Sequence, residues 1–139
     1  MIQSGVCWSY KRELHEGVHD FREDVIKAAL YTSNASLSPS LTTVYSSTNE
    51  ATGTNWSAGG VVLPVSSGYP QLAGERSGVK FDDVEVEEVT VSFRAILIYN
   101  ASKANRAILI LDRGIDVNLT AGTLELFTNP ISPYLLFNA

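Results

Sequence analysis

The chain has 139 residues, 45% of them apolar, and a mean hydropathy near zero, which suits one domain whose core needs no disulfides. Its net charge of −5 and its ten scattered basic residues argue against a nucleic-acid-binding surface, which needs clustered Lys and Arg. With one cysteine, no signal-peptide pattern and no apolar run of about 20 residues, a secreted disulfide scaffold and a membrane protein are also disfavoured. We expect a single domain over residues 1–139, made as a soluble cytosolic protein.

Residues 3–16 are predicted to form the one convincing helix. Apolar side chains recur every four residues along this stretch: Ile2, Val6, Tyr10, Leu14 and Val18. Charged side chains take the other side: Lys11, Arg12, Glu13 and Glu16. Ser4 is a candidate cap for the helix start and Gly17 a candidate stop, and we interpret Cys7, beside the apolar stripe, as a core residue.

A first strand is predicted over residues 24–31, although Ala28 and Ala29 leave a helical interpretation open. A polar stretch rich in Ser, Thr, Asn and Gly follows over residues 32–60, in which only residues 41–45 suggest a short element. Between Lys27 and Glu75 the only charged side chain is that of Glu50. Long loops inside a compact domain are usually functional or docking segments, so we expect partner contacts here and in the N-terminal segment.

Residues 89–112 are predicted to form a central β-hairpin, because two dense apolar runs flank the polar turn ASKAN. In the first run apolar residues alternate with polar ones, which predicts one dry face. From Ile96 onward both alternating sets are apolar, so this part should be covered on both sides.

Shorter strands are predicted on either side of the hairpin: residues 61–65, 79–81, 84–86, 123–128 and 134–137. Pro64 pushes the first toward a sheet edge or a bulge, a turn falls at residues 68–70, and Asn129 and Pro130 break the chain before the last strand. Seven or eight short strands and one N-terminal helix predict a mainly β fold, an antiparallel β-sandwich resembling a jelly roll.

The segment His15 to His19 reads HEGVH, which matches the HExxH pattern of zinc hydrolases. That chemistry requires a helix that continues through His19, but Gly17 costs about 1 kcal/mol inside a helix and is a natural terminator. No third ligand follows at a recognisable spacing, and Glu23 or Asp24 could serve only after a turn. We therefore expect no catalytic residues, no metal and no cofactor, and we interpret both histidines as partly exposed residues at a helix end.

Five acids fall within seven residues: Asp82, Asp83, Glu85, Glu87 and Glu88. They lack the spacing and the glycine of a calcium loop, and their alternation with Val84 and Val86 predicts a solvated edge strand.

Four aromatic residues are candidate partner contacts: Trp8, Tyr45, Trp56 and Tyr69. Trp8 falls off the main stripe of the predicted helix, and Trp56 lies in the charge-poor stretch. The alternative for both tryptophans is burial over the core, since large aromatic side chains are buried on average.

Several segments together carry a family resemblance: MIQSGVC (1–7), the predicted helix at 11–17, ALYTS (29–33), YSSTNEATGTNWSAGG (45–60) and the hairpin (95–112). They resemble, in order from residue 1 to about 123, a family of small virion proteins of tailed bacteriophages. Residues 68–88 and the last residues match more weakly, and residues 16–19 (EGVH) look like family scaffold rather than a metal motif.

The resemblance implies a non-enzymatic structural role in the virion, and the family motif has no catalytic residues to carry over. Small β-rich proteins of this kind are typical of capsid decoration or cement proteins, so the expected partner is the major capsid protein and the expected state a homo-oligomer. Two alternatives remain open: a tail or neck adaptor, and a carbohydrate-binding jelly roll on the virion surface, with Tyr45, Trp56 and Tyr69 as stacking rings.

Overall fold

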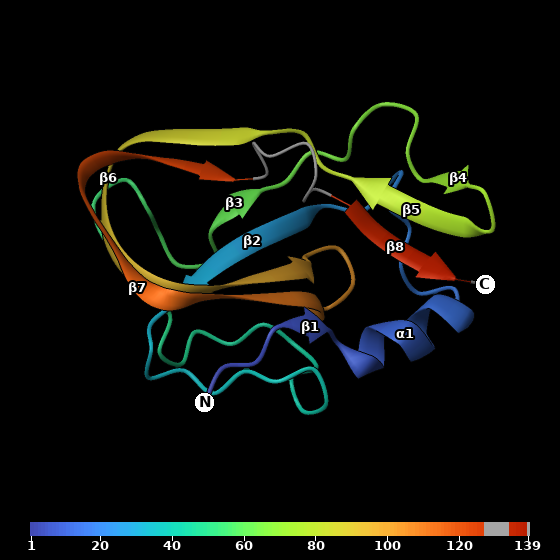
Figure 1. Cartoon of the computed structure of the whole chain (residues 1–139), viewed down its shortest axis with the longest axis horizontal. Coiled ribbons are helices and arrows are strands. Elements are labelled where there is room, and N and C mark those ends of the chain that lie inside the picture. The colour runs from blue at the N-terminus through green and yellow to red at the C-terminus, as the bar shows by residue number, and fades with distance from the viewer. Residues whose placement is uncertain (127–133, 139) are drawn as a thin grey trace.

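The computed structural model describes residues 1–126 and 134–138. Its described part is mainly β, with antiparallel pairing throughout both sheets and one short helix, α1 (Trp8–His15). The first sheet has the order β1 (Gly5–Val6), β7 (Arg106–Leu126), β6 (Val84–Asn100), β2 (Ile26–Tyr31) and β3 (Val61–Val62). The second has the order β4 (Gln71–Ala73), β5 (Arg76–Lys80) and β8 (Tyr134–Asn138). The two sheets, the helix and the polar loops surround a common core (Figure 1).

The predicted central hairpin is confirmed, and it is longer than predicted. Strand β6 lies in the middle of the first sheet, paired with β7 on one side and β2 on the other. Every residue from Ala95 to Asn100 is buried, as expected for a strand covered on both faces. Earlier in the same strand, Thr90 and Ser92 are exposed on its solvent-facing side.

Both hairpin strands bend back sharply at one end of the molecule, at the left in Figure 1. The register shifts between Val86 and Val89, between Val89 and Val91, and between Phe93 and Ala95. Such β-bulges increase the local twist and bend a strand. The distal half of the hairpin therefore folds over the core (Figure 1), and its residues Val89, Val91 and Phe93 are buried in that core.

The predicted helix start was wrong. Residues 3–7 are extended, and β1 pairs Gly5 with Ile110 and Val6 with Leu109. The Ser4 hydroxyl accepts a hydrogen bond from the Asp112 N–H at 2.7 Å instead of capping the helix. A spacing of four is even, so it places Ile2 and Val6 on one side of a strand as well as on one side of a helix.

The predicted helix stop was right. The Gly17 N–H donates to the Leu14 carbonyl and the Val18 N–H to the Glu13 carbonyl, a Schellman pattern with Gly17 at φ 71°. The buried side of the helix differs from the predicted apolar side. Tyr10 and Glu13 are buried, whereas Leu14 is 36% exposed. Glu13 was expected on the solvent side, and that expectation was wrong.

The remaining strand predictions mostly agree with the structure. Strand β3 lies at the edge of the first sheet just before Pro64, and the acidic stretch at 84–86 opens β6. That stretch was predicted as an edge strand, and among the described strands it pairs only with β7, on one side. The break predicted at Asn129 and Pro130 lies outside the described residues.

Candidate docking surface

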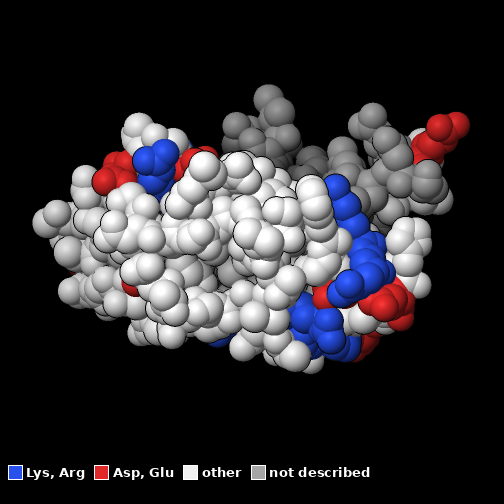
Figure 2. Space-filling view, turned by 90° about the horizontal axis from the view of Figure 1, so that it is seen from below, with Lys and Arg blue, Asp and Glu red and all other residues white. Residues whose placement is uncertain are grey.

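One face of the molecule carries almost no charge. It is built from residues 1–8 and 32–49, which contain no Asp, Glu, Lys or Arg, and we call it the charge-poor face. Figure 2, which views the molecule from the side where these segments lie, shows a broad white surface with the charged residues near its ends. A continuous surface of this kind loses little hydration free energy when a partner covers it.

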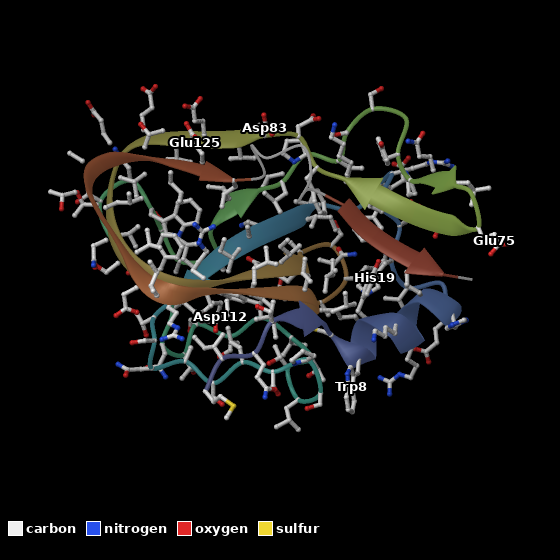
Figure 3. The ribbon with its side chains drawn as sticks, viewed as in Figure 1. Trp8, His19, Glu75, Asp83, Asp112 and Glu125 are labelled. Atoms are coloured by element: carbon white, nitrogen blue, oxygen red, sulfur yellow. The ribbon has the colours of Figure 1, made fainter. Side chains whose placement is uncertain are left out.

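Four large apolar side chains stand out on this face. Met1 and Leu41 are each 82% exposed, Trp8 is 62% exposed and Val44 is 48% exposed. Trp8 points away from the body of the protein in Figure 3. Single exposed apolar residues are common, but several within one uncharged surface are typical of interaction sites.

The backbone holds this face in place. The Leu37 N–H donates to the Met1 carbonyl at 3.0 Å, and the Gln3 N–H donates to the Leu37 carbonyl at 2.9 Å. The Trp8 N–H donates to the Pro39 carbonyl at 2.8 Å. The N-terminal segment and residues 37–39 are thus paired side by side, so the exposed side chains are positioned before any partner arrives.

A hollow of about 320 Å³ lies within the face. The described residues that line it are all uncharged: Tyr31, Ala35, Ser36, Leu37, Leu41, Thr42, Thr43, Val44, Ser46, Thr48 and Asn49. Its wall contains both apolar side chains and hydroxyl groups, so it can accept an uncharged side chain or a short segment of a partner.

The single charge of the long loop is used internally. Glu50 accepts a hydrogen bond from the Tyr45 hydroxyl at 2.5 Å and another from the Gly59 N–H at 2.7 Å. The Tyr99 hydroxyl donates to the Gly59 carbonyl at 2.6 Å, and the rings of Tyr45 and Tyr99 stack at 4.7 Å. Burial and the adjacent Glu50 carboxylate raise the pKa of Tyr45 above its ordinary value. Glu50 therefore joins Tyr45 and Gly59, two parts of the same loop, and Tyr99 attaches that loop to β6.

The structure places the four predicted contact residues in different environments. Trp8 lies on the charge-poor face, and the half-buried Tyr45 is hydrogen-bonded to Glu50. Trp56 is only 2% exposed and belongs to the core, so it offers no contact surface. Tyr69 lies in the turn before β4, away from the face. The sequence analysis did not name Met1, Leu41 and Val44, whose signal is an apolar side chain within an uncharged stretch.

The HExxH segment does not form a zinc site. His15 is exposed at the helix end, whereas the His19 imidazole is fully buried beyond Gly17. We expected two partly exposed histidines, and for His19 that was wrong. No group of three potential ligands that could hold a metal ion occurs within residues 1–126 and 134–138.

His19 belongs to a buried polar network between the end of α1 and the hairpin turn. The Ser102 N–H donates to the Asn100 Oδ1 at 3.0 Å, which fixes the orientation of that amide. Asn100 Nδ2 then donates to Asp24 at 2.8 Å and to His19 Nδ1 at 3.0 Å. His19 Nδ1 must therefore be the acceptor, so Nε2 carries the proton and donates to Glu13 at 2.9 Å. Both ring nitrogens of His19 are thus engaged in hydrogen bonds within the protein.

Two cations complete the network at its ends. Arg106 donates to Glu13 at 2.7 Å, and Lys103 contacts Asp24 at 2.8 Å. Burial opposes ionisation of Asp24, but the hydrogen bonds from Asn100 and Lys103 outweigh it and hold its pKa below the ordinary value. The arrangement thus joins α1, the segment that follows it and the hairpin turn through hydrogen bonds and ion pairs.

Cys7 is fully buried beside the helix start. Burial, assisted by the charge of Glu13, raises the pKa of its thiol to about 11. A protonated, inaccessible thiol is a poor nucleophile, which agrees with the interpretation of Cys7 as a core residue.

Comparison of the chain with models of protein families, with curated proteins and with solved structures found no match. Helix α1 has eight residues, and the described part of the chain contains no helix with the length and apolarity of a membrane span.

Proposed function

We propose that this chain is a non-enzymatic structural protein of a tailed-phage virion that decorates the head and binds the major capsid protein through its charge-poor face. The observation that carries the docking role is that face, with Met1, Trp8, Leu41 and Val44 exposed on backbone-paired segments. The virion role rests on the family resemblance of residues 1 to about 123, and the head is a further step, taken because small one-domain β-rich proteins are typical of capsid decoration.

Such a face suits attachment to a repeating assembly. Buried apolar anchors in an uncharged, preorganised surface give most of the binding energy of typical interfaces. A lattice supplies many identical sites, and a symmetric homo-oligomer would engage several of them at once, so each contact can be modest. We further propose that the two sheets form a β-sandwich resembling a jelly roll, a rigid body suited to clamping neighbouring subunits.

The carbohydrate-binding alternative has less support. Sugar stacking was expected on Tyr45, Trp56 and Tyr69, but the Trp56 ring is in the core and the Tyr45 ring is stacked on Tyr99. Attachment to tail or neck proteins would use the same charge-poor face, so copy number distinguishes it from head decoration.

The number of copies per particle tests the head assignment. Quantitative mass spectrometry of purified virions should give a ratio to the major capsid protein of the order expected for decoration of the whole shell. A few copies per particle would transfer the protein to the tail or neck. Absence from the particle would overturn the virion role.

Replacing the anchors should weaken docking. Leu41→Ser and Trp8→Ser should each reduce affinity for particles that lack the protein by about tenfold or more, since burying such a side chain contributes about 1.5–3 kcal/mol. Leu72→Ser is the matched control, because Leu72 is 76% exposed but lies on β4, outside the face. Cosedimentation with particles measures the effect, and equal losses in all three variants would argue against docking through this face.

A further inference from the structure

The negative charge of the protein is concentrated on the distal half of the hairpin. Residues 82–94 and 112–125, which we call the acidic ribbon, contain eight of the fifteen acids but only two of the ten basic residues. The ribbon thus has a net charge of −6, and the rest of the chain has a net charge of +1, His being neutral.

The acids of the ribbon face water. Seven of the eight are exposed: Asp82, Asp83, Glu85, Glu87, Glu88, Asp116 and Glu125. The eighth, Asp112, binds Arg94 at 3.1 Å, so that base is already engaged. Glu85 and Glu125 lie directly opposite each other in the β6 and β7 register, where like charges repel. Covering this surface with a partner would strip water from carboxylates that already repel one another.

The outer part of the acidic ribbon, with Asp83 and Glu125, lies on the opposite side of the molecule from the charge-poor face (Figure 3), whereas the Asp112 end borders that face through its hydrogen bond to Ser4. In Figure 3, Asp83 and Glu125 are at the top and Trp8 is at the bottom, with the core between them. The ribbon cannot turn independently, because Val89, Val91 and Phe93 from β6 and Leu124 and Leu126 from β7 are buried beneath it. The two surfaces therefore keep a fixed relation, and the position of one determines that of the other.

We propose that docked copies all present the acidic ribbon outward, so that binding gives the assembly an anionic outer layer. This inference rests on the proposed docking function and adds its orientation. Burying the charge-poor face costs little hydration, whereas burying the ribbon against a surface without matching bases costs much, so the outward ribbon is the favoured orientation.

Cysteine labelling on the particle tests the orientation. Ser40→Cys places a thiol on the charge-poor face and Thr123→Cys places one on the ribbon, both at exposed positions. The native Cys7 is buried and should stay unlabelled, and labelling of both variants in the free protein confirms that the new thiols are accessible. Docking to particles should abolish maleimide labelling of Ser40→Cys and leave that of Thr123→Cys unchanged.

The reverse protection pattern, or protection of both thiols, would overturn the orientation while leaving docking itself intact. Failure of both variants and the native chain to cosediment with particles would instead overturn the proposed function, and the orientation with it.

A second readout uses the charge itself. Docking should increase the electrophoretic mobility of particles toward the anode. The triple variant Glu85→Gln, Glu87→Gln, Glu125→Gln should dock equally well and lose about half of that increase, since it removes three of the six net negative charges. An unchanged mobility, or loss of docking by this variant, would contradict an outward ribbon.

Discussion

Replacing Glu13 with alanine is expected to destabilise the protein by about 1–3 kcal/mol, which is the usual cost of leaving a buried hydrogen-bond donor without its acceptor. Glu13 is fully buried and accepts hydrogen bonds from His19 Nε2 and from Arg106. Its removal leaves the His19 N–H without an acceptor, because Nδ1 is already engaged by Asn100. Urea unfolding followed by circular dichroism measures the change in free energy of unfolding.

The same helix provides the control. Glu16 is exposed and contacts Arg12 at 3.6 Å, with both side chains largely in water. Glu16→Ala should change stability by less than about 1 kcal/mol, because exposed ion pairs contribute little. If Glu13→Ala were as mild as Glu16→Ala, the network around His19 would not stabilise the fold.

Replacing Gly60 with alanine is expected to cost about 3 kcal/mol or more, which combines left-handed backbone strain with overpacking. Gly60 has φ 76°, and a Cβ there would lie 1.7 Å from the Ala28 carbonyl oxygen and 2.6 Å from its carbon. These are backbone atoms of β2, which is paired with β6 on one side and β3 on the other, so they cannot move aside without disturbing that pairing.

Gly68→Ala separates the two causes. Gly68 has a similar φ of 86°, but a Cβ there meets no atom within 4 Å. This variant should lose only about 1–2 kcal/mol from backbone strain. Thermal unfolding of both proteins checks the prediction, and equal losses would mean that the contact with Ala28 can be relieved.

The central hairpin could be predicted because its signal is local. Alternating and then continuous apolar residues on both sides of a polar turn determine two long strands and their burial, and the structure agrees from Val89 to Asp112. The helix stop was equally readable, because Gly17 adopts a left-handed conformation that other residues avoid. The bend of the hairpin could not be predicted, since β-bulges depend on how β6 and β7 pair with each other.

The N-terminal segment was misread because its pattern is ambiguous. Ile2 and Val6 fit one side of a helix and one side of a strand equally well, and pairing with β7 decided between them. Residues 109–110 of β7 offered unpaired backbone groups to this segment, and that contact spans about 100 residues of chain, so no local pattern could reveal it.

The sequence by itself determined a mainly β chain around residues 89–112 and an uncharged stretch over residues 32–49, because apolar periodicity and the positions of charges are local properties. Only the tertiary structure decided that residues 1–8 join this stretch on one face, that Trp56 is buried, and that Glu13 and His19 meet Asn100 and Arg106 inside the protein. The physical reason is that burial and hydrogen bonding depend on which segments meet in space, and here hydrogen-bonded partners lie up to 108 residues apart.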